Sequence, residues 1–155
     1  MKTFFKLSGI IAFVVALVGF ILSLTTTGII VAPDTFLETK LSGAEATFGT
    51  NLFDGAVTAV LAFVFALIAL VILCIGVILP ILKVKNLDKV AGLLNCIAVI
   101  CLIVAGVLCF FTKSSFSSAN SDVSANLGVA FILGGILYIA AGVIAICPTI
   151  ANLIK

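Results

Sequence analysis

The sequence predicts an all-α protein: a four-helix transmembrane bundle with a small extracellular β-ribbon in the first outer loop. Of its 155 residues, 64% are hydrophobic and 9% are charged, whereas soluble domains carry about 25% charged residues. Four apolar runs contain no charged residue and are long enough to cross a bilayer as helices: about 7–24, 56–82, 90–111 and 127–147. The connections are too short for a soluble domain, so we expect residues 1–155 to form a single tetraspan membrane domain.

The second run, 56–82, gives the clearest signal. Its 27 residues include 18 Val, Leu, Ile or Phe, which together favour membrane insertion by about 7 kcal/mol. As a helix the run would reach roughly 40 Å, more than the hydrocarbon thickness of about 30 Å. We therefore expect a helix that is tilted or protrudes, and that Pro80 kinks or ends.

Lysines distinguish the two sides of the predicted bundle. The termini and the 83–89 turn hold six lysines and one aspartate, a net charge of +5. The outer loops, 25–55 and 112–126, hold two lysines and five acidic residues, a net charge of −3. Because cytoplasmic loops of membrane proteins are enriched in Lys and Arg, we expect a multi-pass protein of the plasma (cell) membrane with both termini in the cytoplasm.

The first run, 7–24, is interpreted as a membrane-spanning helix. The alternative is a secretory signal peptide, but the run is longer than the usual 7–15-residue apolar core of such peptides. Small residues in a stripe let helices approach closely in a membrane, and two such stripes are expected to pack on each other. The candidate helix-packing residues here are Gly9, Ala12, Ala16 and Gly19 in the first run, and Ala59, Ala62, Ala66 and Ala69 in the second.

The first outer loop, 25–55, has mixed signals. Residues 26–32 are β-prone and end at Pro33, and 44–53 is expected to return as a strand. Thr35 followed by Glu38 resembles a capping box, which predicts a short surface helix over 35–42. The loop is rich in large apolar groups, which should pack on the bilayer, on each other or on a partner. Its candidate contact residues are Phe36, Leu41, Phe48 and Phe53.

The second half of the chain is simpler. Asn95 lies near the predicted cytoplasmic start of the third run. The second outer loop, 112–126, is rich in Ser and Asn, and we expect it to be mobile or to cover the surface of the bundle. Pro148 is expected to stop the fourth helix. Further candidate packing residues in that helix are Gly134, Gly135 and Gly142. The candidate pore or interhelical polar residues of the whole chain are Thr58, Asn95 and Tyr138.

The sequence offers little for chemistry. It has no His, all six carboxylates lie in predicted loops or turns, and phosphate-binding and nucleophile motifs are missing. The five cysteines lie in or at the ends of apolar runs, where they are interpreted as small packing residues. We therefore predict no catalytic, cofactor-binding or metal-binding residue, no cofactor and no nucleic-acid partner.

The order of features resembles tetraspan membrane proteins: a long first outer loop, a short second one and both termini inside. TFGTNLFDG (47–55) running into a span, with a lysine turn after it, is similar to the small four-helix proteins common in bacterial genomes. Claudins share the topology, but their signature of a Trp, a Gly-Leu-Trp and two cysteines in the outer loop is missing here. The resemblance implies a topology and no activity.

Three functions stay open at this point. The first is a non-enzymatic membrane protein, embedded in the lipid bilayer, that associates with itself as a homo-oligomer or with another membrane protein, as a scaffold or complex subunit. The second is an oligomeric channel or facilitator for small solutes. The third is a membrane enzyme, whose reacting group would come from a loop, such as Asp54 or Asp88.

Overall fold

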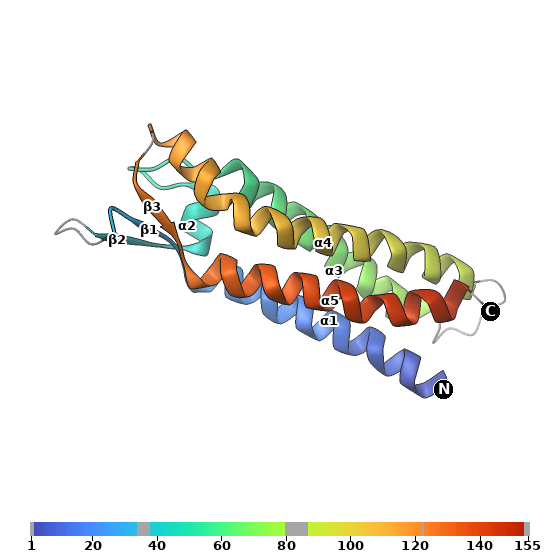
Figure 1. Ribbon diagram of the computed structural model, residues 1–155. Coiled ribbons are helices and arrows are strands. Elements are labelled where there is room, and N and C mark those ends of the chain that lie inside the picture. Colours follow the sequence, from blue (N-terminus) through green and yellow to red (C-terminus); the bar gives the residue numbers. More distant parts are fainter. Residues whose placement is uncertain (1, 34–37, 80–86, 122, 154–155) are drawn as a thin grey trace.

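Figure 1 shows the computed structural model of the protein, which describes residues 2–33, 38–79, 87–121 and 123–153. Four long helices form a bundle: α1 (Lys2–Thr25), α3 (Val57–Ile78), α4 (Leu87–Ala119) and α5 (Val129–Leu153). At one end lie the short helix α2 (Gly43–Phe48) and three strands, β1 (Thr27–Val31), β2 (Thr39–Ser42) and β3 (Ala125–Leu127). The predicted all-α fold class with a small ribbon is confirmed.

Within the described residues, all four long helices have the length and composition to cross a membrane. Their outward faces expose Leu, Ile, Val and Phe side chains along their length, as expected for surfaces in contact with lipid. Pro80, the predicted end or kink of the second helix, lies outside the described residues.

Two predicted helix ends are wrong. α4 does not stop at Phe111 but continues to Ala119, because Phe116 on the extension is completely buried and adds packing that the Ser-rich sequence does not suggest. α5 continues through Pro148 to Leu153. A Pro in a membrane helix is tolerated where neighbouring groups compensate for the lost backbone bond, and Pro148 lies beside Gly9 of α1.

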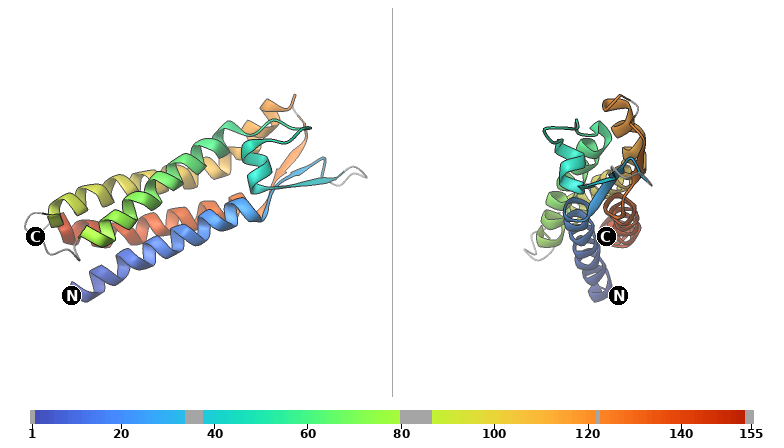
Figure 2. Two further views of the ribbon diagram at one scale, coloured as in Figure 1. Left: turned by 180° about the vertical axis from the view of Figure 1, so that it is seen from behind. Right: turned by 90° about the vertical axis from the view of Figure 1, so that its left-hand side faces the viewer.

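The helices pack in the order α1, α5, α4, α3, and α1 meets α3 less extensively (Figure 2). The interior of the bundle is built mainly from alanines, together with Leu73, Leu102 and Tyr138. Since alanine and glycine lack bulky side chains, the backbones approach closely. A methyl group added at Gly135 of α5, for example, would lie 3.0 Å from the Gly106 carbonyl oxygen of α4.

Strand β1 is the centre of an antiparallel sheet with the order β2-β1-β3. Ile30 of β1 is opposite Lys40 of β2 and opposite Asn126 of β3. The sheet therefore joins the two loops, because β3 comes from the second one. The expectation that all of 112–126 is a mobile or covering loop is wrong, since the segment supplies the end of α4 and most of β3.

The helix and the return strand predicted in the first loop are also wrong. Thr39–Ser42 is a strand and Gly43–Phe48 is a helix, while residues 34–37 lie outside the described residues. The capping box at the start of α2 is formed by Ser42 and Glu45, whereas Thr35 of the predicted box lies outside the described residues. The Glu45 N–H donates to Ser42 Oγ (3.2 Å), and the Ser42 N–H donates to Glu45 Oε2 (2.8 Å).

Three glycines allow the chain to cross itself where the sheet meets the bundle. The Gly43 N–H donates to the Thr26 carbonyl (2.8 Å), and the Gly128 N–H donates to the Gly28 carbonyl (2.7 Å). A side chain on any of the three would meet backbone at less than van der Waals distance. The α1–α5 helix pair therefore continues directly into the β1–β3 strand pair.

Candidate functional site

The cap is the part of the structure at the sheet end of the bundle, namely the described residues of 26–56 and 112–128 (Figure 1). Its two halves are joined by Asn120, which follows α4. The Asn120 Oδ1 accepts from the Asp54 N–H (2.8 Å), and its Nδ2 donates to the Asp54 carbonyl (3.0 Å) and to the Phe116 carbonyl (2.9 Å). This paired contact fixes the connection between α2 and α3 to the end of α4.

The same connection contains a tight turn, which we call the Leu52 turn (residues 50–53). Thr50 Oγ1 accepts from the N–H groups of Leu52 (3.2 Å) and Phe53 (3.1 Å), and the Thr50 N–H donates to the Phe53 carbonyl (2.7 Å). The ring of Phe53 packs on Phe116, with 5.9 Å between the ring centroids. The turn is therefore held on both sides, yet Leu52 at its centre is 85% exposed.

The four candidate contact residues of the first loop have different surroundings. Leu41 is buried in the sheet and is not available to a partner, whereas Phe53 is half-buried against Phe116. Phe48 is exposed, and Phe36 lies outside the described residues.

Thr58 lies at the cap end of α3. Its N–H donates to Ser115 Oγ of α4 (3.4 Å). Ser115 thereby accepts from a free N–H group in the first turn of α3, where the N-cap residue Ala56 has no side chain that could accept. The buried Thr58 Oγ1 has no hydrogen-bond partner among the described residues.

Tyr138 lies in the bundle interior below the cap. Its hydroxyl lies 3.1 Å from Ser23 Oγ of α1, and Ser23 Oγ donates to the Phe20 carbonyl (2.9 Å), which leaves Tyr138 as the donor to Ser23. A cavity of about 10 Å³ beside this pair is bordered also by Thr47 and Cys109. This volume is near the minimum of about 10–15 Å³ for one water molecule.

Asn95 lies towards the other end of the bundle, where α4 meets α3. The side chain is 5% exposed, and its Oδ1 occupies the place that a side chain on Gly76 would take. No hydrogen-bond partner for this Oδ1 is found in the part of the chain that the structure describes. The predicted interhelical amide hydrogen bond is thus not formed through Oδ1, and the amide packs on the backbone of α3 instead.

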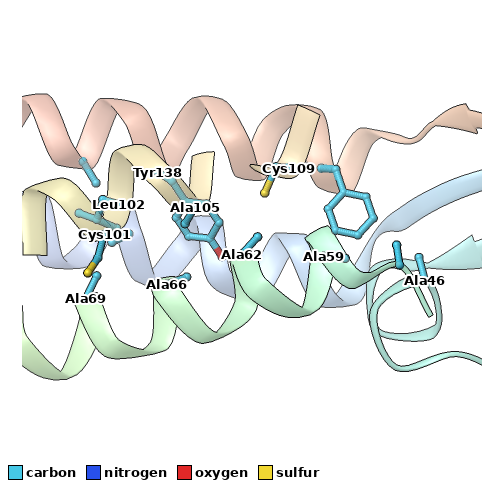
Figure 3. Close-up of a cluster of buried hydrophobic side chains, with 14 of the residues drawn as sticks. Ala46, Ala59, Ala62, Ala66, Ala69, Cys101, Leu102, Ala105, Cys109 and Tyr138 are labelled. Atoms are coloured by element: carbon cyan, nitrogen blue, oxygen red, sulfur yellow. The ribbon is translucent and has the colours of Figure 1, made fainter. Parts of the chain in front are cut away.

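The three candidate polar residues do not share a path through the chain. Asn95 is 14 residues before Cys109 in α4, a separation of roughly 21 Å along the helix, whereas Cys109 and Tyr138 border the same cavity. Thr58 is at the end of its helix, against α4. Between these levels the interior is filled by the alanines of α3 together with Leu102, Ala105 and Tyr138 (Figure 3).

The small-residue stripes are buried in helix–helix contacts within one copy of the chain. The α1 stripe meets mainly α5, since a methyl group on Gly19 would lie 3.0 Å from Leu137 Cβ, and one on Gly134 would lie 3.0 Å from Ser23 Cβ. The alanines of α3 face the interior shared with α4 (Figure 3). The buried residues of the predicted set are Gly9, Ala12, Ala16, Gly19, Ala59, Ala62, Ala66, Ala69, Gly134, Gly135 and Gly142. The expected packing of the first stripe on the second therefore accounts for the smaller part of its contacts, because α1 meets α3 less extensively than α5.

The cysteines divide into two groups. Cys101 and Cys109 are buried, as expected for packing residues, whereas Cys74, Cys96 and Cys147 lie on exposed faces of the helices. Nowhere in the described ranges do three or more His, Cys, Asp or Glu side chains come together in a group suited to a metal ion.

Two features of the cap were not predicted from the sequence. The Ser42–Glu45 pair has the same S/T-x-x-E pattern as Thr35–Glu38 and was available as a signal. The contact of Asn120 with Asp54 joins residues 66 positions apart, so no pattern of neighbouring residues in the sequence predicts it.

Comparison of the chain with protein families, curated proteins and solved structures finds no match. The class of protein therefore rests on the fold. Four apolar helices with exposed apolar faces define a multi-pass integral membrane protein.

Proposed function

We propose that this protein is a non-enzymatic integral membrane protein that acts by association, as a scaffold or a subunit of a complex. Its cap would bind another copy of the chain or a second membrane protein. The observation that supports this proposal is the Leu52 turn, in which an exposed apolar side chain stands on a backbone fixed from both sides. Binding through a preorganised turn loses less conformational entropy than binding through a flexible loop.

Burial of the small-residue stripes reduces the part of the protein surface that is available for association with a partner. Because the small residues of α1, α3 and α5 face the interior, they are not available to a second copy. The exposed helix faces offer large apolar side chains that lipid covers equally well. The cap is therefore the part of the protein that we expect to discriminate between partners.

The test compares the full chain with Leu52→Ser in lipid nanodiscs taken directly from membranes. We expect the natural chain to crosslink to a copy or a partner. Burying a Leu contributes about 1.5–3 kcal/mol, so the variant should associate about tenfold more weakly or worse. Asn51→Ser, a change at the neighbouring exposed position, is the matched control and should associate normally. A natural chain that is strictly monomeric and recovers no partner contradicts the proposal.

An oligomeric channel or facilitator stays a prediction. Its pore would have to lie between copies, because Thr58, Asn95 and Tyr138 do not share a path within one. Solute flux into liposomes containing the protein, compared with empty liposomes, tests this alternative directly.

A further inference from the structure

The depth of the cap in the membrane follows from α3. Its 22 residues span about 33 Å, close to a hydrocarbon thickness of about 30 Å. The start of α3 therefore lies near one surface of the hydrocarbon, and Phe63 lies about 9 Å further in along the helix. Phe20 of α1 is at a similar level, since its ring centroid is 5.2 Å from that of Phe63.

The short helix α2 reaches down to this level. The ring of Phe48, its last residue, stands edge-on to Phe63 with 5.3 Å between the centroids. At the other end of α2, the Gly43 N–H donates to the Thr26 carbonyl just after α1. Thr47 is buried against the interior of the bundle. α2 is thus fixed beside the cap ends of α1 and α3 and does not stand above them.

Phe48 is 62% exposed in spite of its contact with Phe63. On α3, Val60 and Leu67 lie one helical turn before and after Phe63, and they and Val64 are exposed on the lipid-facing surface of the helix. The ring of Phe48 extends this apolar surface onto the cap. The charged residue of α2, Glu45, is also exposed and lies in the first turn, three residues before Phe48 and about 4.5 Å from it along the helix axis, towards the Gly43 end.

We infer that α2 is a lipid-contacting element and that Phe48 inserts into the hydrocarbon of the leaflet on the side of the sheet. The cap then has two surfaces. The Leu52 turn faces water, and the end of α2 is immersed in lipid beside α3. The inference does not depend on the proposed function, because lipid contact by Phe48 requires no protein partner.

The chain contains no Trp, so a single introduced Trp reports one position by its fluorescence. The probe is Phe48→Trp in the full chain, reconstituted in phosphatidylcholine vesicles with and without bromine on the acyl chains. Val64→Trp is the matched reference for hydrocarbon, and Asn51→Trp is the reference for water. All three positions are exposed on the protein surface, so a Trp fits without repacking the core.

We expect Phe48→Trp to have blue-shifted emission, to lose most of its intensity in brominated vesicles as Val64→Trp does, and to resist quenching by iodide. Asn51→Trp should show the opposite pattern. Quenching of Phe48→Trp by iodide and not by brominated lipid would overturn the inference, because Phe48 would then be in water. Protection from both quenchers would overturn it too, because a protein would then cover the ring.

Discussion

At the scale of single residues, the contact of Asn95 with Gly76 is unusual, because a buried amide oxygen within the bilayer faces a backbone and not a donor. An unpaired polar atom in hydrocarbon destabilises the fold. A side chain at residue 76 would need the space of this amide, so the Asn95 side chain would have to shift. The two residues therefore form a complementary pair across the α3–α4 interface.

This pairing predicts the outcome of a double-mutant cycle. Gly76→Ala should lower the free energy of unfolding by about 1–3 kcal/mol, as overpacking of an interior does. Asn95→Ala removes the amide that the new methyl group would meet, so adding it to Gly76→Ala should restore stability. Unfolding of the purified variants in mixed micelles, followed by circular dichroism, measures the three free energies. Additive losses in the double variant would show that the two side chains do not share this space.

At the scale of elements, α2 depends on its capping box. The backbone N–H and the side chain of Ser42 both hydrogen-bond within the box and hold the pKa of Glu45 below its ordinary value of 4.5. A carboxyl with a lowered pKa stabilises the folded state above its ordinary pKa, and this contribution is lost as the pH falls through the folded value. The Glu45 carboxylate thus contributes to stability at neutral pH, and its contribution is lost in acid.

We expect Ser42→Ala to cost about 1 kcal/mol at neutral pH, typical of a lost helix cap. Glu45→Gln should be less stable than the natural chain at neutral pH, and the difference should shrink as the pH falls below 4.5. Thermal unfolding across this pH range, with and without Ser42→Ala, measures the effect. If Glu45→Gln has the same pH dependence as the natural chain, the carboxylate does not serve as a cap.

The elements also show what the sequence could predict. The four helices were predictable because lipid demands long uncharged runs, and β1 was predictable from its β-branched residues before Pro33. The sequence could not decide between the capping patterns Thr35–Glu38 and Ser42–Glu45, because Thr39–Ser42 forms a strand only through its pairing with β1. The Ser-rich end of α4 was missed for the same reason: burial of Phe116 and the Asn120 contact with Asp54 favour a helix that local propensity does not.

The candidate site depends mainly on contacts that the sequence does not show. Leu52 is one of the large apolar residues of the first loop, but its fixed turn depends on Thr50 and on Asn120. Thr58, Asn95 and Tyr138 were recognised by their polarity alone. Polarity along a sequence does not give depth in a bundle or the identity of a neighbour, so the separation of these residues appears only in three dimensions.

At the scale of the whole molecule, the distribution of charge along the sequence and the fold both distinguish the two ends of the bundle. The cap gathers the segments of net negative charge, and the start of α1 and the end of α5 lie together at the opposite end of the bundle (Figure 1). The positive-inside rule then predicts that the cap is outside the cell.

Labelling of intact cells tests this orientation. In a chain whose five cysteines are replaced by alanine or serine, Asn51→Cys should react with a membrane-impermeant maleimide. A cysteine added before residue 1 should react only after the cells are opened. The reverse pattern would place the cap in the cytoplasm.

The central position of β1 has a consequence for biosynthesis. β1 leaves the ribosome early, together with its partner β2, but its other neighbour β3 is made only after α3 and α4. Until β3 has been made, one edge of β1 stays unpaired in the nascent chain, and unpaired strand edges favour aggregation. Loss of the chain from β3 onwards should therefore leave a product that cellular quality control recognises by its incomplete sheet, even though three hydrophobic helices are already in the membrane.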